Sequence, residues 1–162
     1  MCDYCDCRTH PAIASLSAEH EVVLELLGDL RRAAAVQDRA TGVAVLARLH
    51  DVLSAHATRE ERGVFNALRH AGISHSYLDW FERDHGRIHA LLDTSVTEHR
   101  EDWQGAAEEL VHLLVDHILR EESDLFPVAH QVLSPRQWDE VDAVHERLIH
   151  PNVANPNHAG VA

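Results

Sequence analysis

Two ten-residue segments of the chain align without a gap and carry ionisable residues on what would otherwise be an apolar helix face. Segments 56–65 (HATREERGVF) and 117–126 (HILREESDLF) share the His, the Arg, two adjacent Glu and the final Phe. Upstream of each segment stands an acidic residue followed by His, namely Glu19-His20 and Asp84-His85. Apolar packing alone would not select these polar residues twice. The repeat therefore predicts two related helical hairpins.

Apolar residues recur every three or four positions along four stretches of the chain. These stretches are residues 15–36, 41–69, 75–98 and 103–132. Such spacing is typical of amphipathic helices, and no stretch shows the alternation of a strand. Gly72 is expected to end the second helix and Ser74 to cap the third, while Ser134-Pro135 with Gln137 predicts a fifth helix ending near Ile149.

The expected fold class is all-α, an up-down-up-down four-helix bundle with a short fifth C-terminal helix and irregular N- and C-terminal tails. A chain of 162 residues is long enough to bury one core. We expect a Cys-rich N-terminal tail over residues 1–12, the bundle over residues 13–150 and an irregular tail over residues 151–162.

Composition excludes several classes of partner. The chain has 14 Lys and Arg against 27 Asp and Glu, a formal charge of −13 that argues against nucleic acids and anionic membranes. No apolar run is long enough to span a bilayer, and residues 1–7 lack the basic start and apolar stretch of a secretory signal. The expected location is cytoplasmic, where cysteines seldom form structural disulfides.

The repeated residues have the chemistry of metal ligands. His56 and Glu60 are four residues apart, as are His117 and Glu121, so each pair projects from one helix face. Each pair stands where a core Leu is expected, and burying unpaired charges there costs several kcal/mol, of the order of a domain's whole stability. Bound cations offset that cost. Imidazole and carboxylate ligands suit iron or manganese better than structural zinc.

The order of these residues resembles the hemerythrin-like, or HHE cation-binding, family over roughly residues 13–132. The resemblance rests on His20, His56-x-x-x-Glu60, His85, His117-x-x-x-Glu121 and the following Leu125-Phe126-Pro127. It implies a non-heme centre of two Fe ions joined by an oxo or hydroxo bridge. By position, Glu60 and Glu121 would bridge the ions, His20 and His56 would bind one iron, and His85 and His117 the other.

Two positions need separate comparison with the pattern of the oxygen-carrying members. Those members place a His-x-x-x-His on the third helix, and His89 follows His85 at that spacing, but His85 aligns with the single ligand His20 of the first half. His89 is thus either a fifth imidazole ligand or a partly exposed neighbour of the site. The carriers also use Asp five residues after the last His, where this chain has Glu122, and we prefer Glu121. Glu61, Glu122, Arg59 and Arg120 are expected to form surface ion pairs or to contact the ligands.

The N-terminal residues Cys2, Cys5, Cys7 and His10 form a second candidate site. Three thiolates and an imidazole can bind zinc, with His150 or His158 as a further ligand if the tails meet. The cysteines could instead relay electrons, or they could be incidental thiols of a flexible tail. The other histidines of the chain are expected to be solvated.

The family resemblance and the open coordination positions of a di-iron site point to small oxidants such as O2, H2O2 or NO. The first hypothesis is an enzyme of catalase or peroxidase type that removes peroxide or responds to oxidative and nitrosative stress. The second is a non-catalytic protein that binds or senses oxygen or iron. The third is a helical interaction module without metal.

Overall fold

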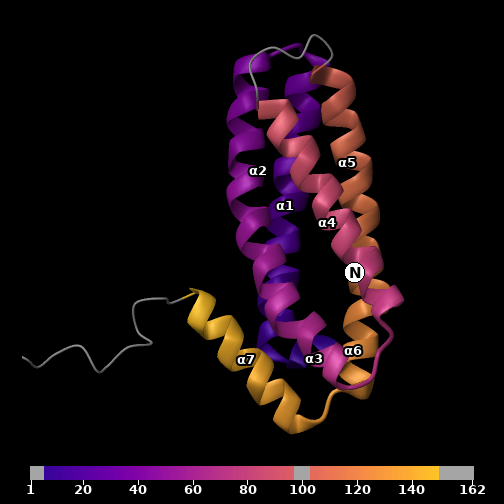
Figure 1. Cartoon of the computed structure of the whole chain (residues 1–162). Helices are drawn as coiled ribbons and strands as arrows, with labels where there is room; N and C mark the ends of the chain where they lie inside the picture. Colours follow the sequence, from indigo (N-terminus) through magenta and orange to yellow (C-terminus); the bar gives the residue numbers. More distant parts are fainter. Residues whose placement is uncertain (1–5, 97–102, 150–162) are drawn as a thin grey trace, which may run out of the picture.

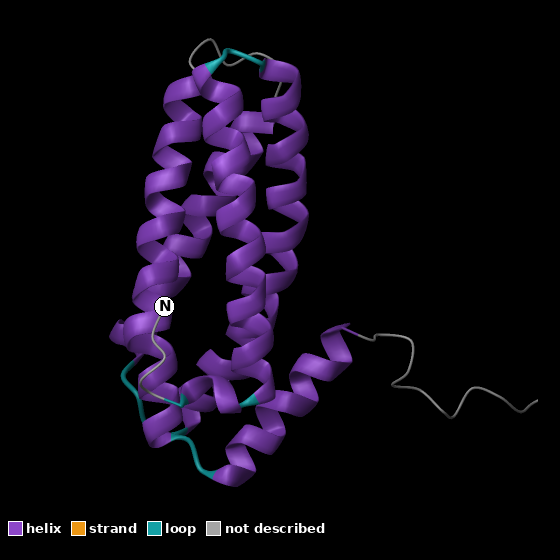
Figure 2. Ribbon diagram, turned by 180° about the vertical axis from the view of Figure 1, so that it is seen from behind, coloured by secondary structure: helices purple, strands orange, loops and turns teal. Residues whose placement is uncertain are grey.

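The computed structural model describes residues 6–96 and 103–149, and within these ranges every regular element is a helix (Figures 1 and 2). The prediction of an all-helical chain is confirmed for this part of the chain. The long helices are α1 (Pro11–Ala35), α2 (Arg39–Arg59), α4 (His75–Val96) and α5 (Trp103–Arg120). The shorter elements are η1 (Cys7–Thr9), η2 (Glu60–Phe65), α3 (Asn66–His70), η3 (Glu121–Leu125), α6 (Phe126–Val132) and α7 (Pro135–Ile149).

The four long helices lie side by side, and the chain runs in alternate directions along them (Figure 1). Helix α1 packs against α2 and α5, and α4 packs against the same two helices. Helix α7 crosses one end of the bundle beside α3 and contacts η2 (Figures 1 and 2). No described helix combines the length and apolarity needed to cross a membrane.

Helix α1 begins at Pro11, earlier than the expected start at Ser15. Proline occupies the first helical position, where its missing N–H leaves no hydrogen bond unmade and its fixed φ suits the helix. Before it, Cys7–Thr9 forms a short 3-10 helix whose Cys7 side chain is buried. The expectation of an irregular tail over residues 1–12 is therefore wrong for residues 7–12.

The helix boundaries predicted from capping residues are confirmed at two places. Gly72 has φ 89°, a left-handed conformation that favours glycine, and it follows the end of α3. The Ser74 hydroxyl accepts a hydrogen bond from the backbone N–H of Tyr77 at 3.3 Å. At the start of α7 the Gln137 side chain accepts a hydrogen bond from the Ser134 backbone N–H at 3.0 Å.

The sequence periodicity predicted a continuous α-helix through each of the two repeat segments. The structure differs from this prediction. Each segment changes to a π-helix at its first Glu, η2 from Glu60 and η3 from Glu121. A π-helical turn holds more residues than an α-helical turn, and such turns occur frequently at functional sites. In the second repeat the π-helix ends at Leu125, two residues before Pro127, which has no N–H to donate to an α-helical turn.

Two apolar clusters fill the bundle and leave a polar layer between them. The Trp103 cluster includes Val23, Leu27, Leu49, Ile88, Leu114 and Trp103. The Trp138 cluster includes Cys7, Leu16, Phe65, Phe81, Phe126 and Trp138. His20 lies on α1 between Leu16 of one cluster and Val23 of the other. Both clusters keep water away from the layer between them.

A close contact in the Trp103 cluster gives a test of the packing. A Cβ atom added to Gly42 would lie 2.6 Å from Cζ3 of the buried Trp103 ring. Gly42→Ala should lower the free energy of unfolding by about 1–3 kcal/mol, because the indole must move. Gly86→Ala, where nothing lies within 4 Å of the new Cβ, should instead raise it by about 0.5–1 kcal/mol. Urea unfolding of both variants measures this, and a Gly42→Ala protein as stable as the parent would contradict it.

Candidate metal centre

Six ionisable side chains meet in the polar layer between the two apolar clusters. The first hairpin supplies His20 from α1, with His56 at the end of α2 and Glu60 at the start of η2. The second hairpin supplies His85 from α4, His117 from α5 and Glu121 from η3. All six are buried, and Glu60 and Glu121 have no exposed surface at all. We call these six residues the inner cluster.

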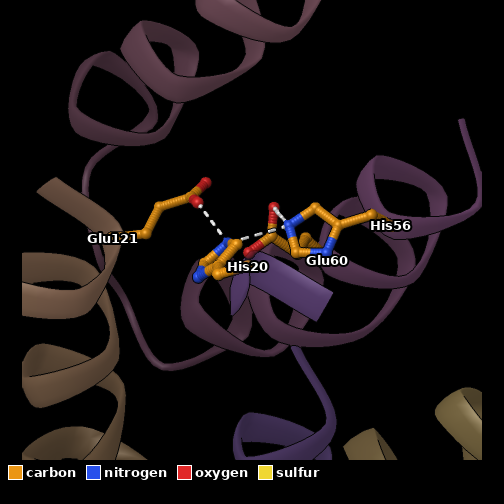
Figure 3. Close-up of side chains that lie close together, drawn as sticks. All are labelled: His20, His56, Glu60 and Glu121. Atoms are coloured by element: carbon orange, nitrogen blue, oxygen red, sulfur yellow. Dashed lines mark hydrogen bonds and ion pairs between the residues drawn. The ribbon is translucent and has the colours of Figure 1, made fainter. Parts of the chain in front are cut away.

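The inner cluster divides into two groups, each able to surround a metal ion. In one group, His20, His56, Glu60 and Glu121 bring ligand atoms within 4.8 Å of one another (Figure 3). In the other, His85 and His117 stand beside the same two carboxylates. Both carboxylates are thus shared by the two groups.

Each shared carboxylate reaches imidazoles of both hairpins. An oxygen of Glu60 lies 3.4 Å from Nε2 of His56 and 3.3 Å from Nε2 of His85. The oxygens of Glu121 lie 2.8 Å from Nε2 of His117 and 3.1 Å from Nε2 of His20. Because the contacts cross between the hairpins, the site exists only when both halves of the repeat are packed together.

The orientation of these atoms fits a metal better than it fits hydrogen bonding. Both oxygens of Glu60 and of Glu121, together with Nε2 of His85 and of His117, are buried without a hydrogen-bond partner among the described residues. Buried polar atoms rarely go unsatisfied in native proteins. Their short separations without hydrogen-bond geometry indicate that their lone pairs point to shared positions between them.

The opposite nitrogen of each imidazole faces a second carboxylate. The four outer carboxylates are Glu19, Glu61, Asp84 and Glu122. Nδ1 of His56 lies 2.9 Å from Glu19, and Nδ1 of His117 lies 3.9 Å from Asp84. Nδ1 of His20 lies 2.9 Å from Glu122, and Nδ1 of His85 lies 2.8 Å from Glu61. An ionised carboxylate can only accept, so Nδ1 carries the hydrogen and Nε2 of the neutral ring keeps a lone pair for a metal.

Arginines neutralise three of the four outer carboxylates. Arg59 pairs with Glu19, and Arg120 lies 3.1 Å from Asp84. Arg8, from the short 3-10 helix, lies 3.0 Å from Glu122. The guanidinium of Arg120 also stacks over the ring of Trp80, 3.7 Å from its centroid.

The carboxylates of the cluster favour the protonated form of two of its imidazoles. Burial lowers the pKa of His20, but the adjacent Glu121 and Glu122 carboxylates outweigh it and raise that pKa to about 10. Burial likewise opposes the charged form of His85, whose pKa Glu121, Glu60 and Glu61 raise to about 12. Burial raises the pKa of Glu121, yet the neighbouring imidazoles, His117 first, bring it well below its usual range. Protons thus occupy the positions where cations would compensate the carboxylates.

His89 is not part of either group of the inner cluster. It lies on the wall of a cavity of about 10 Å³ whose other lining residues are imidazoles of the cluster and apolar side chains. The apolar lining residues are Leu53, Ala57, Ile88, Leu114 and Ile118. Burial and the nearby His85 and His50 lower the pKa of His89. Among the described residues, it is the one polar side chain of this cavity that is not itself in the inner cluster.

The N-terminal candidate site is only partly within the described residues. Cys2 and Cys5 lie outside them. Cys7 is buried and disulfide-bonded, which contradicts the expectation that no cysteine forms a structural disulfide and leaves no thiolate on Cys7 to bind zinc. Nε2 of His10 lies 3.0 Å from Nδ1 of His130, and its ring stacks on Trp138. Cys7 and His10 therefore belong to packing contacts in this structure.

Sequence reasoning missed several residues that surround the inner cluster. It gave Glu19, Asp84 and Arg8 no role, although Glu19 and Asp84 precede His20 and His85 at the same place in both repeats. The presence of an acidic residue before the ligand His in both repeats could have indicated that these carboxylates contact the site. It also expected His145 to be solvated, whereas this side chain is buried beside Arg59 and Glu19, with Nε2 unpartnered among the described residues.

Comparison with known proteins agrees with this geometry. A family model described as the hemerythrin HHE cation-binding domain matches residues 12–129, which include the whole inner cluster and the outer carboxylates. No curated protein matches the chain.

The shared carboxylates can be tested by substitution. Glu60→Ala or Glu121→Ala should leave the protein unable to retain a pair of metal ions, because each carboxylate contacts both groups. Iron per chain after anaerobic loading and desalting measures the effect, with the exposed Glu108→Ala as the matched control. Full loading of both inner variants would contradict the arrangement.

Metal binding should become stronger as the pH rises. The pKa of His20 in the ion-free fold lies above its usual 6.5, so its ion pairs stabilise that fold fully below about pH 6.5 and lose their contribution toward about pH 10. A metal must displace these protons, so its apparent affinity should increase with pH while protons are released. Proton release on adding Fe(II) anaerobically in weak buffer measures this, and uptake without release would contradict it.

Proposed function

This chain belongs to the hemerythrin HHE cation-binding domain family, and on that premise we propose that it is a non-heme di-iron protein that breaks down hydrogen peroxide. The observation that carries the proposal is the pair of fully buried, shared carboxylates among four imidazoles, directly beside a cavity of about 10 Å³. The proposal includes the four-helix bundle of this family, formed by α1, α2, α4 and α5 with their extensions.

The ligand set supports two ions of iron. Each group offers two imidazoles and two carboxylates, and it offers no thiolate of the kind that structural zinc sites often use. Nitrogen and oxygen ligands of this kind, with coordination positions left open, are typical of redox-active iron or manganese pairs. Iron in such a site supplies two-electron exchange with small oxidants.

The cavity limits the substrate to very small molecules. About 10 Å³ is close to the least volume that admits one water molecule, so a two-atom or four-atom oxidant fits with slight adjustment of the side chains. Hydrogen peroxide, dioxygen and nitric oxide are of this size, whereas organic substrates are not. Leu53, Ile88, Leu114 and Ile118 keep the cavity largely apolar and exclude bulk water.

The residues of the chain have distinct roles in peroxide breakdown. Two molecules of H2O2 yield two of H2O and one of O2, so the reaction needs no outside electron donor. The outer carboxylates hold the four imidazoles in their orientation. His89 stands at the cavity wall and is neutral at pH 7 because its pKa is lowered, so its ring can accept a proton from peroxide and return it to the departing water.

A second candidate function is reversible oxygen binding without turnover. The enclosed, mostly apolar cavity favours it, because exclusion of water protects a bound gas from side reactions. In this case His89 would stabilise the bound molecule by a hydrogen bond, and no oxygen would be released from peroxide.

An oxygen electrode distinguishes the two functions. The iron-loaded protein should release one O2 for every two H2O2 consumed, at a rate proportional to bound iron, and Glu121→Ala should abolish the release. A reversible colour change on oxygenation, with no oxygen released from peroxide, would replace the first function by the second.

Substitution of His89 tests its part in the reaction. His89→Ala should retain its iron and lower the rate of oxygen release by about 100-fold or more, because the proton carrier at the cavity is lost. The exposed His112→Ala is the matched control and should keep the parental rate. Loss of iron from His89→Ala would show instead that His89 is a ligand.

A further inference from the structure

The two metal positions of the repeat differ in their surroundings. Glu61 and Glu122 occupy equivalent places in the two repeats, and each contacts Nδ1 of an imidazole from the other hairpin. The Glu122 side chain is 6% exposed, whereas the Glu61 side chain is 40% exposed. Among the ion pairs of residues 6–96 and 103–149, Glu122 pairs with Arg8, whereas Arg69, the arginine that acts on Glu61 through its charge, forms its ion pair with Glu82.

The arginine that makes this difference comes from outside the repeat. Nη2 of Arg8 lies 3.0 Å from Glu122, and the same side chain lies 3.7 Å from Glu21. Residues on both sides of Arg8 are anchored. Cys7 is 1% exposed within the Trp138 cluster, and the His10 ring stacks on Trp138 with 3.8 Å between centroids. Arg8 is therefore presented to Glu122 by a fixed segment.

We infer that Arg8 is a positioning residue which, through Glu122, makes the metal position of His20 and His56 the tighter of the two. At this position both outer carboxylates, Glu122 and Glu19, are held by arginines, so both imidazoles are fixed before a metal arrives. Fixing the orientation of ligand imidazoles through their outer partners typically changes metal affinity by about 10- to 100-fold.

At the metal position of His85 and His117, both imidazoles are held less firmly by their outer carboxylates. His85 depends on the half-exposed Glu61, and Nδ1 of His117 is 3.9 Å from Asp84, beyond hydrogen-bond distance. Its ligands must be ordered when the metal binds, which lowers the affinity. The inference rests on the proposed pair of ions, and it predicts the order in which they are bound and lost.

Stepwise titration of the full-length, metal-free protein with Fe(II) under anaerobic conditions tests the inference, with a competing chelator to resolve affinities. The parent should bind two ions in steps separated by about 10-fold or more. Arg8→Gln should weaken the tighter step by about 10- to 100-fold and leave the other within a few-fold, so that the steps merge. Arg8→Lys should restore part of the separation, and the exposed Arg136→Gln should change nothing.

Glu61→Gln provides a second variant in case Arg8→Gln does not fold, as judged by circular dichroism. It removes the outer carboxylate of the weaker position and should widen the separation by weakening the second step alone. Two equal steps in the parent, or equal weakening of both steps in Arg8→Gln, would overturn this inference and leave the di-iron proposal standing. Binding of one ion or none by the parent would overturn the proposed function itself.

Discussion

Compensation of two buried carboxylates is the constraint on which the rest of this structure depends. Glu60 and Glu121 have no contact with water, and isolated charges in such a place would cost more than a domain's folding free energy can cover. The molecule surrounds them with shells of alternating charge. Imidazoles face the inner carboxylates, outer carboxylates face the imidazoles, and arginines face most of the outer carboxylates. The proposed metal ions would compensate the two carboxylates at the centre of this arrangement.

The repeat explains the symmetry of the inner cluster. Each hairpin contributes one shared carboxylate and two imidazoles, while most outer contacts join one helix or hairpin to another. A single hairpin could therefore assemble neither group of the inner cluster. One departure from symmetry comes from outside the repeat, because the short N-terminal helix supplies Arg8 to Glu122, and another lies within it, because Asp84 is farther from His117 than Glu19 is from His56. The two groups of the inner cluster thus contain the same residue types but differ in the contacts around them.

The sequence alone predicted the helices and the residues of the inner cluster, because a repeated His-x-x-x-Glu on an apolar stripe has few other physical explanations. It did not predict the π-helices. One additional residue in a turn leaves the three- or four-residue spacing of apolar side chains intact on either side of it, so the spacing did not reveal the π-helices. Glu61 and Glu122 were therefore expected on the helix surface or beside the ligands, and the sequence did not identify the residue that each contacts. The partners could not be identified because they lie on other helices, and spacing along one helix says nothing about which imidazole faces Glu122. The sequence also left open whether His89 faces the inner cluster, because that depends on how α4 is rotated about its own axis, and the spacing of residues does not determine that rotation.

The stacking of Arg120 on Trp80 links an indole at the protein surface to the centre. Trp80 is 38% exposed, and the chain of contacts continues from Arg120 to Asp84 and then to His117. A shift of the His117 imidazole on metal binding would act on Asp84 and, through it, on the Arg120 guanidinium above the Trp80 ring. The fluorescence of Trp80 is therefore a suitable readout for metal titrations, because this exposed ring lies at the end of a series of contacts that leads to His117.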